Sequence, residues 1–105
     1  MSRKESEIQK SIIDWLRIQP NTFVFRVFTF GVPIGRTGTF RKNYNKGIAD
    51  ILGVKNGRFF AFEVKKLKAK LEDHQEMWLR HVDDAGGYAC VVRSLDDAIE
   101  AFKEI

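Results

Sequence analysis

The sequence predicts a small α/β domain in which a mixed β-sheet is flanked by helices. Three segments carry apolar residues at the spacing of an amphipathic helix, and four others are rich in residues that favour strands. An Asn-Gly pair separates two of the strand-like segments, which is the strongest short signal for a β-hairpin. The resulting order of helix, strand, hairpin, helix, strand and helix favours a sheet packed between helices.

Two of the expected helices lie near the two ends of the sequence. Residues 4–18 form the first, Pro20 ends it, and its apolar stripe contains Ile8, Ile12, Trp15 and Leu16. Near the other end, Ser94 and Asp97 have the spacing of a helix-capping pair. A helix follows them, and the residues expected to face the core are Ala98, Ile99 and Phe102.

The strand-like segments differ in how they are expected to pack. Residues 22–30 are rich in Phe, Val and Thr and predict a strand that lies in the core or on a dimer surface. Residues 48–54 and 58–66 flank the Asn-Gly pair, whose positions need positive φ, and predict the hairpin. Residues 88–92 are continuously apolar, as expected for a strand with helices over both faces.

Two further segments complete the pattern. Residues 72–85 predict a helix that stops at Gly86, with a stripe made of Leu71, Gln75, Trp78, Val82 and Ala85. Residues 31–47 have no clear period and contain four glycines, Pro33 and several basic side chains. They predict a long loop, and loops of this length in small domains usually have a functional role.

Size and composition limit the class of protein. The 105 residues predict one domain, 1–105, and 44% hydrophobic residues suffice for a core without staples. A single cysteine, Cys90, excludes a disulfide scaffold and a thiolate zinc site. The absence of a long apolar run predicts a cytoplasmic protein with no membrane partner. The net charge of +4 permits an acidic partner such as nucleic acid.

Two carboxylates are expected to face each other in the hairpin. Counting outward from a two-residue turn at Asn56 and Gly57 places Asp50 opposite Glu63, with Lys65 on the same face. Paired Cβ atoms in such a ladder lie about 5 Å apart, and two charges at that distance repel by roughly 3 kcal/mol at an effective dielectric near 20. A divalent cation such as Mg²⁺ or Mn²⁺ offsets this repulsion.

Polar residues on two helices extend the same cluster. Glu5 continues the apolar stripe of the first helix, and Gln75 interrupts the stripe of the second. Burying an unpaired polar group costs on the order of 1 to 3 kcal/mol, so a shared polar site would give both a partner. The alternative is that Glu63 pairs with Lys65 or Lys66, and that the two helical residues reach water at helix ends.

The combined residues resemble a known nuclease family. Gly47-Ile48-Ala49-Asp50, followed after twelve residues by Glu63-Val64-Lys65, is similar to the Asp…Glu-x-Lys signature of the PD-(D/E)xK nuclease superfamily. With the preceding Glu5 helix and the later Gln75 helix, nearly the whole chain resembles a minimal, stand-alone member of the virus-type replication-repair nuclease (VRR-NUC) family. Ala49 stands where the superfamily name has Pro, which disturbs no chemistry.

The resemblance implies a restriction-endonuclease-like core and a Mg²⁺- or Mn²⁺-dependent phosphodiesterase acting on DNA. By this similarity Asp50, Glu63 and the main-chain carbonyl of Val64 are metal ligands, and Lys65 orients or activates the attacking water. Glu5 matches the first-helix acid, which is a further metal ligand, with Glu7 as the second choice. Gln75 matches the supporting glutamine of the later helix.

The resemblance also implies a substrate and an assembly. Stand-alone members of the family are similar to Holliday-junction resolvases in using paired subunits, so branched DNA and a homodimer are expected. The alternatives are a non-catalytic nucleic-acid-binding module, and a flap, nicking or restriction-like nuclease with the same site. The residues expected to contact phosphates are Arg36, Arg41, Lys42, Lys46 and Lys66.

Overall fold

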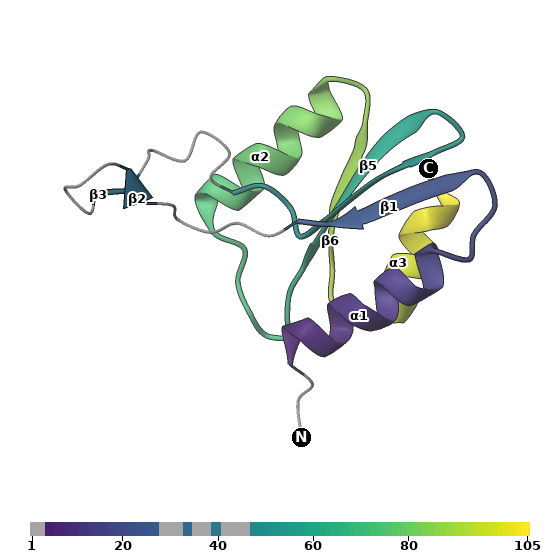
Figure 1. Ribbon diagram of the computed structural model, residues 1–105, viewed down its shortest axis with the longest axis horizontal. Coiled ribbons are helices and arrows are strands. Elements are labelled where there is room, and N and C mark those ends of the chain that lie inside the picture. Colours follow the sequence, from purple (N-terminus) through teal and green to yellow (C-terminus); the bar gives the residue numbers. More distant parts are fainter. Residues whose placement is uncertain (1–3, 28–32, 35–38, 41–46) are drawn as a thin grey trace.

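The computed structural model describes residues 4–27, 33–34, 39–40 and 47–105, and a four-stranded sheet forms its centre (Figure 1). The strand order is β1-β4-β5-β6. The first three strands are antiparallel neighbours, and β6 runs parallel to β5, so the sheet is mixed as the sequence predicts. The strands are β1 (Thr22–Arg26), β4 (Ile51–Lys55), β5 (Arg58–Val64) and β6 (Tyr88–Val92).

Helices cover both faces of this sheet. Figure 1 shows α1 (Glu5–Leu16) and α3 (Leu95–Lys103) on one side and α2 (Asp73–Asp84) on the other. Under α1 and α3 lies the larger core, which includes Ile12, Leu16, Phe60, Phe62, Val64 and Val92. A smaller core under α2 contains Ala49, Leu52, Ala61 and Leu79. The α/β class and the three helices predicted from the sequence are therefore confirmed.

Strand β5 divides its side chains between the two cores. Phe60, Phe62 and Val64 enter the larger core, and Ala61 enters the smaller one. Because side chains alternate along a strand, Glu63 shares the face of Ala61. The strand lies between β4 and β6 with helices over both faces of the sheet, and Glu63 is buried near its end.

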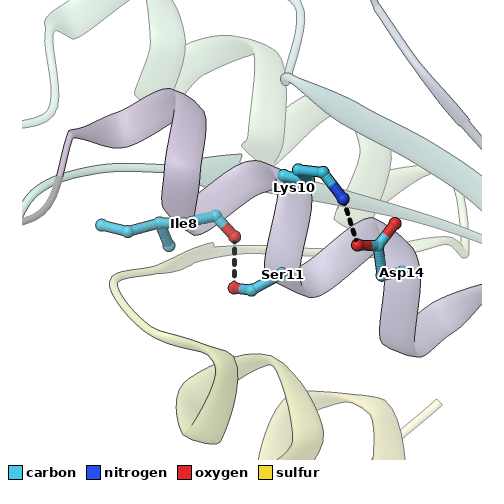
Figure 2. A network of polar contacts seen from close by, with 4 residues as sticks. All are labelled: Ile8, Lys10, Ser11 and Asp14. Carbon is cyan, nitrogen blue, oxygen red and sulfur yellow. Dashed lines mark hydrogen bonds and ion pairs between the residues drawn. The ribbon is translucent and has the colours of Figure 1, made fainter.

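The outer face of α1 is held by local contacts. The ammonium of Lys10 lies 2.6 Å from the Asp14 carboxylate, one turn further along the helix (Figure 2). The Ser11 hydroxyl donates to the carbonyl oxygen of Ile8 at 2.8 Å. Exposed pairs of this kind contribute roughly 0.2 to 1 kcal/mol, so α1 is held mainly by its buried apolar stripe.

The hairpin turn confirms the predicted register. Asn56 and Gly57 have φ values of 49° and 85°, the left-handed conformations that a two-residue hairpin turn requires. Lys55 pairs with Arg58, and the ladder continues outward to the pair of Ile51 and Phe62. One further step outward leads to Asp50 and Glu63, where the sequence places the two acids.

Several details differ from the sequence prediction. In α2 the buried residue is Leu79, which the predicted stripe omits, and Ala85 of that stripe is exposed. The segment 31–47 contains two short paired strands, β2 (Pro33–Ile34) and β3 (Thr39–Phe40), which are too short to show an alternating pattern. Strand β1 stops at Arg26, and residues 28–30 lie outside the described part. The core interpretation of this strand is wrong for Phe23 and Phe25, which are exposed. Ile99 is only partly buried and joins neither core.

Within the described ranges, no helix is both long enough and apolar enough to cross a membrane.

Candidate active site

Asp50 is fixed from two sides at the open end of the hairpin. Its main-chain carbonyl accepts a hydrogen bond from the Val27 N–H at 2.8 Å, which extends the contact between β1 and β4. Its side-chain Oδ2 accepts from the Val64 N–H, also at 2.8 Å. The Asp50 carboxylate therefore lies against β5, beside Glu63, and its position is set by the sheet rather than by a flexible loop.

Glu63 is the buried acid of the pair. Its side chain is only 3% exposed, and its Oε2 atom is buried with no hydrogen-bond partner among the described residues. Burial, followed by a hydrogen bond with Asp50 and the charge of Asp50, raises the pKa of Glu63 to about 9. Two ionised carboxylates only accept hydrogen bonds, so the metal-free pair is held together when Glu63 keeps its proton.

Lys65 is the next residue after Glu63 on the same face of the strand. Its N–H donates to the Val92 carbonyl at 3.1 Å, which continues the parallel ladder between β5 and β6 past the end of the strands. The positive charge of Lys65 lowers the pKa of Glu63, opposing the effect of Asp50. The structure thus brings together the three side chains that the sequence assigned to one polar cluster.

Glu5 borders the cluster from the first turn of α1. Its Oε1 atom accepts a long hydrogen bond, 3.4 Å, from the Lys66 N–H, and its charge also raises the pKa of Glu63. Glu7 lies in the same turn and is exposed. These contacts connect Glu5 to the segment that directly follows β5.

Gln75 makes a local contact at the start of α2. Its Oε1 atom accepts a hydrogen bond from the Glu72 N–H at 3.0 Å and so caps the start of α2. Gln75 therefore has a local partner at the helix end, and its assignment to the shared polar site stays a prediction. The signal was present in the sequence, since Gln at the third helical position is part of a capping box.

Gly47 allows the main chain just before Asp50 to pass close to α2. The residue has a φ of 91°, and a Cβ atom built on it would lie 2.3 Å from the carbonyl oxygen of His74 in the first turn of α2. Any other residue would push the Gly47–Asp50 segment away from the helix. The glycine of the Gly-x-x-Asp pattern is thus explained by close backbone packing, which the sequence alone did not reveal.

The donor set fits a hard divalent cation. An unpartnered, buried carboxylate oxygen beside a second carboxylate is a typical ligand environment for Mg²⁺ or Mn²⁺. Across the described ranges, no group of three or more His, Cys, Asp or Glu side chains is arranged to hold a metal ion. An ion here would therefore be held by the Asp50 and Glu63 pair, completed by main-chain oxygen such as that of Val64 and by water.

The predicted phosphate contacts divide into two groups. Arg36, Arg41, Lys42 and Lys46 lie outside the described residues. Lys66, three residues after Glu63, is exposed. Lys68 and Lys70 are exposed further along the same connection to α2. The described part of the chain therefore presents exposed basic side chains on the segment that follows Glu63.

No family model matches the chain, and no curated protein matches it either.

Proposed function

We propose that the chain is a Mg²⁺- or Mn²⁺-dependent DNA endonuclease, a minimal VRR-NUC protein with the restriction-endonuclease-like core of the PD-(D/E)xK superfamily. The observation that carries this proposal is the buried Glu63 carboxylate, whose Oε2 has no partner in the described structure and which lies beside Asp50. A carboxylate pair of this kind is costly in a domain of this size and is expected where it has a ligand.

Each residue of the cluster has a defined task in this proposal. Asp50, Glu63 and the Val64 carbonyl would hold the ion, and a bound ion would neutralise charge at the phosphate and lower the pKa of a water molecule. Lys65 adds a positive charge beside the phosphate and orients the attacking water. Glu5 lies at the border of the site and holds the Lys66 N–H, which fixes the start of the basic connection.

The substrate and the assembly follow from the same proposal. The exposed Lys66, together with Arg36, Arg41, Lys42 and Lys46, would neutralise backbone phosphates. One chain carries one site, so symmetric cutting of a branched DNA such as a four-way junction requires a homodimer. The protein would act in the cytoplasm, without a membrane partner.

One observation favours a second candidate function. Asp50 already has a structural partner in the Val64 N–H, and Glu63 is held neutral by burial. These contacts are also what a non-catalytic nucleic-acid-binding module would need at the end of its hairpin. Metal binding separates the two candidates, whereas a flap, nicking or restriction-like nuclease shares the site and is separated by its substrate.

The test is cleavage of a panel of linear, flapped and four-way DNA substrates in Mg²⁺, Mn²⁺ or EDTA. We expect metal-dependent cutting that favours branched DNA, and sedimentation as a dimer at the concentrations that give paired products. Glu63→Gln, which keeps the shape of the side chain, is the matched inactive variant. Binding to DNA without cutting in either metal would favour the non-catalytic module.

A further inference from the structure

Arg93 makes an unusual set of contacts directly after β6. Its Nη1 atom donates to the carbonyl oxygens of Lys66 and Ala69 at 2.6 and 2.7 Å and lies 3.3 Å from that of Leu67. The nitrogen carries two hydrogens, so the two short contacts use both of them. The permanently charged guanidinium of Arg93 thus contacts three main-chain carbonyls of one short segment.

That segment connects the candidate active site to α2, and we call residues 66–70 the lysine turn. Its ends are fixed by two further hydrogen bonds. The Lys66 N–H donates to Glu5, and the Ala69 N–H donates to the Lys66 carbonyl at 3.1 Å. With these carbonyls turned toward Arg93, the exposed side chains of the turn are Lys66, Leu67, Lys68 and Lys70.

Arg93 is itself held in place. Its N–H donates to Oδ2 of Asp97 at 2.9 Å, and the Asp97 N–H donates to the Ser94 hydroxyl at the start of α3. The preceding residue, Val92, accepts the hydrogen bond from the Lys65 N–H. The guanidinium therefore extends from a rigid part of the fold, one residue away from the ladder partner of Lys65.

We propose that Arg93 is a positioning residue that holds Lys65 and the lysine turn in the geometry required for catalysis. This inference rests on the proposed nuclease function. A lysine side chain is long and flexible, so its ammonium is placed accurately only if its main chain is rigid. A misplacement of about 1 Å at a reacting group can cost about a hundredfold in rate. None of the contacts of Arg93 requires it to touch DNA.

The chain offers a matched control in Arg58. This residue also donates to two main-chain carbonyls, those of Gly86 and Gly87, at 3.3 and 3.4 Å. It lies at the turn end of the hairpin, far along β5 from Glu63. Arg58→Ala and Arg93→Ala therefore remove the same charge and the same type of contact. The contacts of Arg58 lie at the start of β5, and those of Arg93 lie just past its end.

The first test is amide hydrogen exchange on the metal-free protein, followed by NMR. In Arg93→Ala we expect the Lys66 and Ala69 amides to exchange at least about tenfold faster, with no change in the centre of β5. Arg93→Lys keeps the charge on a shorter and more flexible side chain, so it should give an intermediate increase. Arg58→Ala should leave both amides unchanged. Unchanged exchange of these amides in Arg93→Ala would overturn the positioning role.

The second test separates positioning from a purely structural role. Arg93→Ala should lower kcat by about ten- to a hundredfold and change KM for DNA by less than about threefold. Arg58→Ala should leave both constants near those of the wild type. A normal kcat in folded Arg93→Ala would refute the inference. If the wild type cuts no DNA in either metal, the proposed function fails, while the exchange result still decides whether Arg93 orders the lysine turn.

Discussion

The two ends of the β4–β5 hairpin belong to the same ladder but differ in whether their polar groups have partners. At the turn end, Asn56 and Gly57 adopt the required left-handed conformations, and the Lys55 ammonium donates to the Phe102 carbonyl at 2.7 Å. At the open end, Asp50 and Glu63 lie together, and one buried oxygen of Glu63 has no partner in the described structure. Contacts within the chain satisfy the turn end, whereas the open end is complete only with a proton or a cation.

This comparison separates scaffold from site. The turn end and the larger core specify the fold, and they need no ligand to do so. The open end works against the stability of the fold, because a buried acid beside a second acid is unfavourable. A residue that lowers stability but is placed accurately is a candidate for function.

The largest expected effect is on cleavage by variants at the open end. Asp50→Ala and Glu63→Ala should each lower the rate by a factor of about a thousand or more, because each removes a proposed metal ligand. Both should remain folded, since neither side chain belongs to either apolar core. Asp14→Ala, which removes an exposed acid of α1 (Figure 2), is the matched control. Near wild-type cutting by either active-site variant in Mg²⁺ would refute the nuclease role of the pair.

Substitutions in the larger core should instead lower the stability of the fold. Phe60 is fully buried between the rings of Phe62 and Phe102, at centroid distances of 5.1 and 6.1 Å. Phe60→Ala should therefore lower the free energy of unfolding by about 3 to 5 kcal/mol, measured by urea denaturation. Val54→Ala, at a half-exposed position of the neighbouring strand, should change it by less than about 1 kcal/mol. Equal losses in the two variants would show that the larger core does not carry the fold.

The pairing of Asp50 with Glu63 at the open end could be predicted from the sequence because it depends only on the number of residues from the turn. A two-residue turn fixes the register of the hairpin, and the register places Asp50 opposite Glu63. The period of the strand then places Lys65 on the same face. These steps are local, so no knowledge of the rest of the fold was needed.

Other features depend on contacts between distant segments. Arg93 contacts residues 24 to 27 positions earlier in the chain, and no local pattern signals such a contact. The close approach of Gly47 to α2 is of the same kind. The exposure of Phe23 and Phe25 follows from the position of β1 at the edge of the sheet, which the composition of the strand does not reveal.

The pH dependence of stability sharpens the comparison between the two ends. The pKa of Glu63 is raised from 4.5 to about 9 in the folded protein, so the folded state binds one more proton than the unfolded state between these values. In EDTA, stability should therefore fall as pH rises from about 5 to about 9, by at most about 1.4 kcal/mol per pH unit. Urea denaturation of Glu63→Gln should lack this slope. An equal slope in both proteins would assign the effect to other groups.

A smaller effect is expected from the basic residues that precede Asp50. Changing Arg41 and Lys42 together to Ala should flatten the slope of log affinity for DNA against log salt by roughly two units, if both contact phosphates. Lys10→Ala with Lys103→Ala removes the same charge from exposed helical ion pairs and should leave the slope unchanged. Equal slopes in the two double variants would show that residues 41 and 42 do not contact the DNA backbone.

Proton release on metal binding tests most directly whether the acid pair is a metal site. At pH 7 Glu63 is protonated in the metal-free protein, and a carboxylate ligand must be ionised, so binding of Mg²⁺ or Mn²⁺ should release close to one proton per ion. Isothermal titration calorimetry in buffers of different ionisation enthalpy measures this number, with Glu63→Gln as the reference. We predict about one proton for the wild type and none for the variant. Metal binding without proton release, or equal binding by both proteins, would contradict the assignment of Asp50 and Glu63 as the metal site.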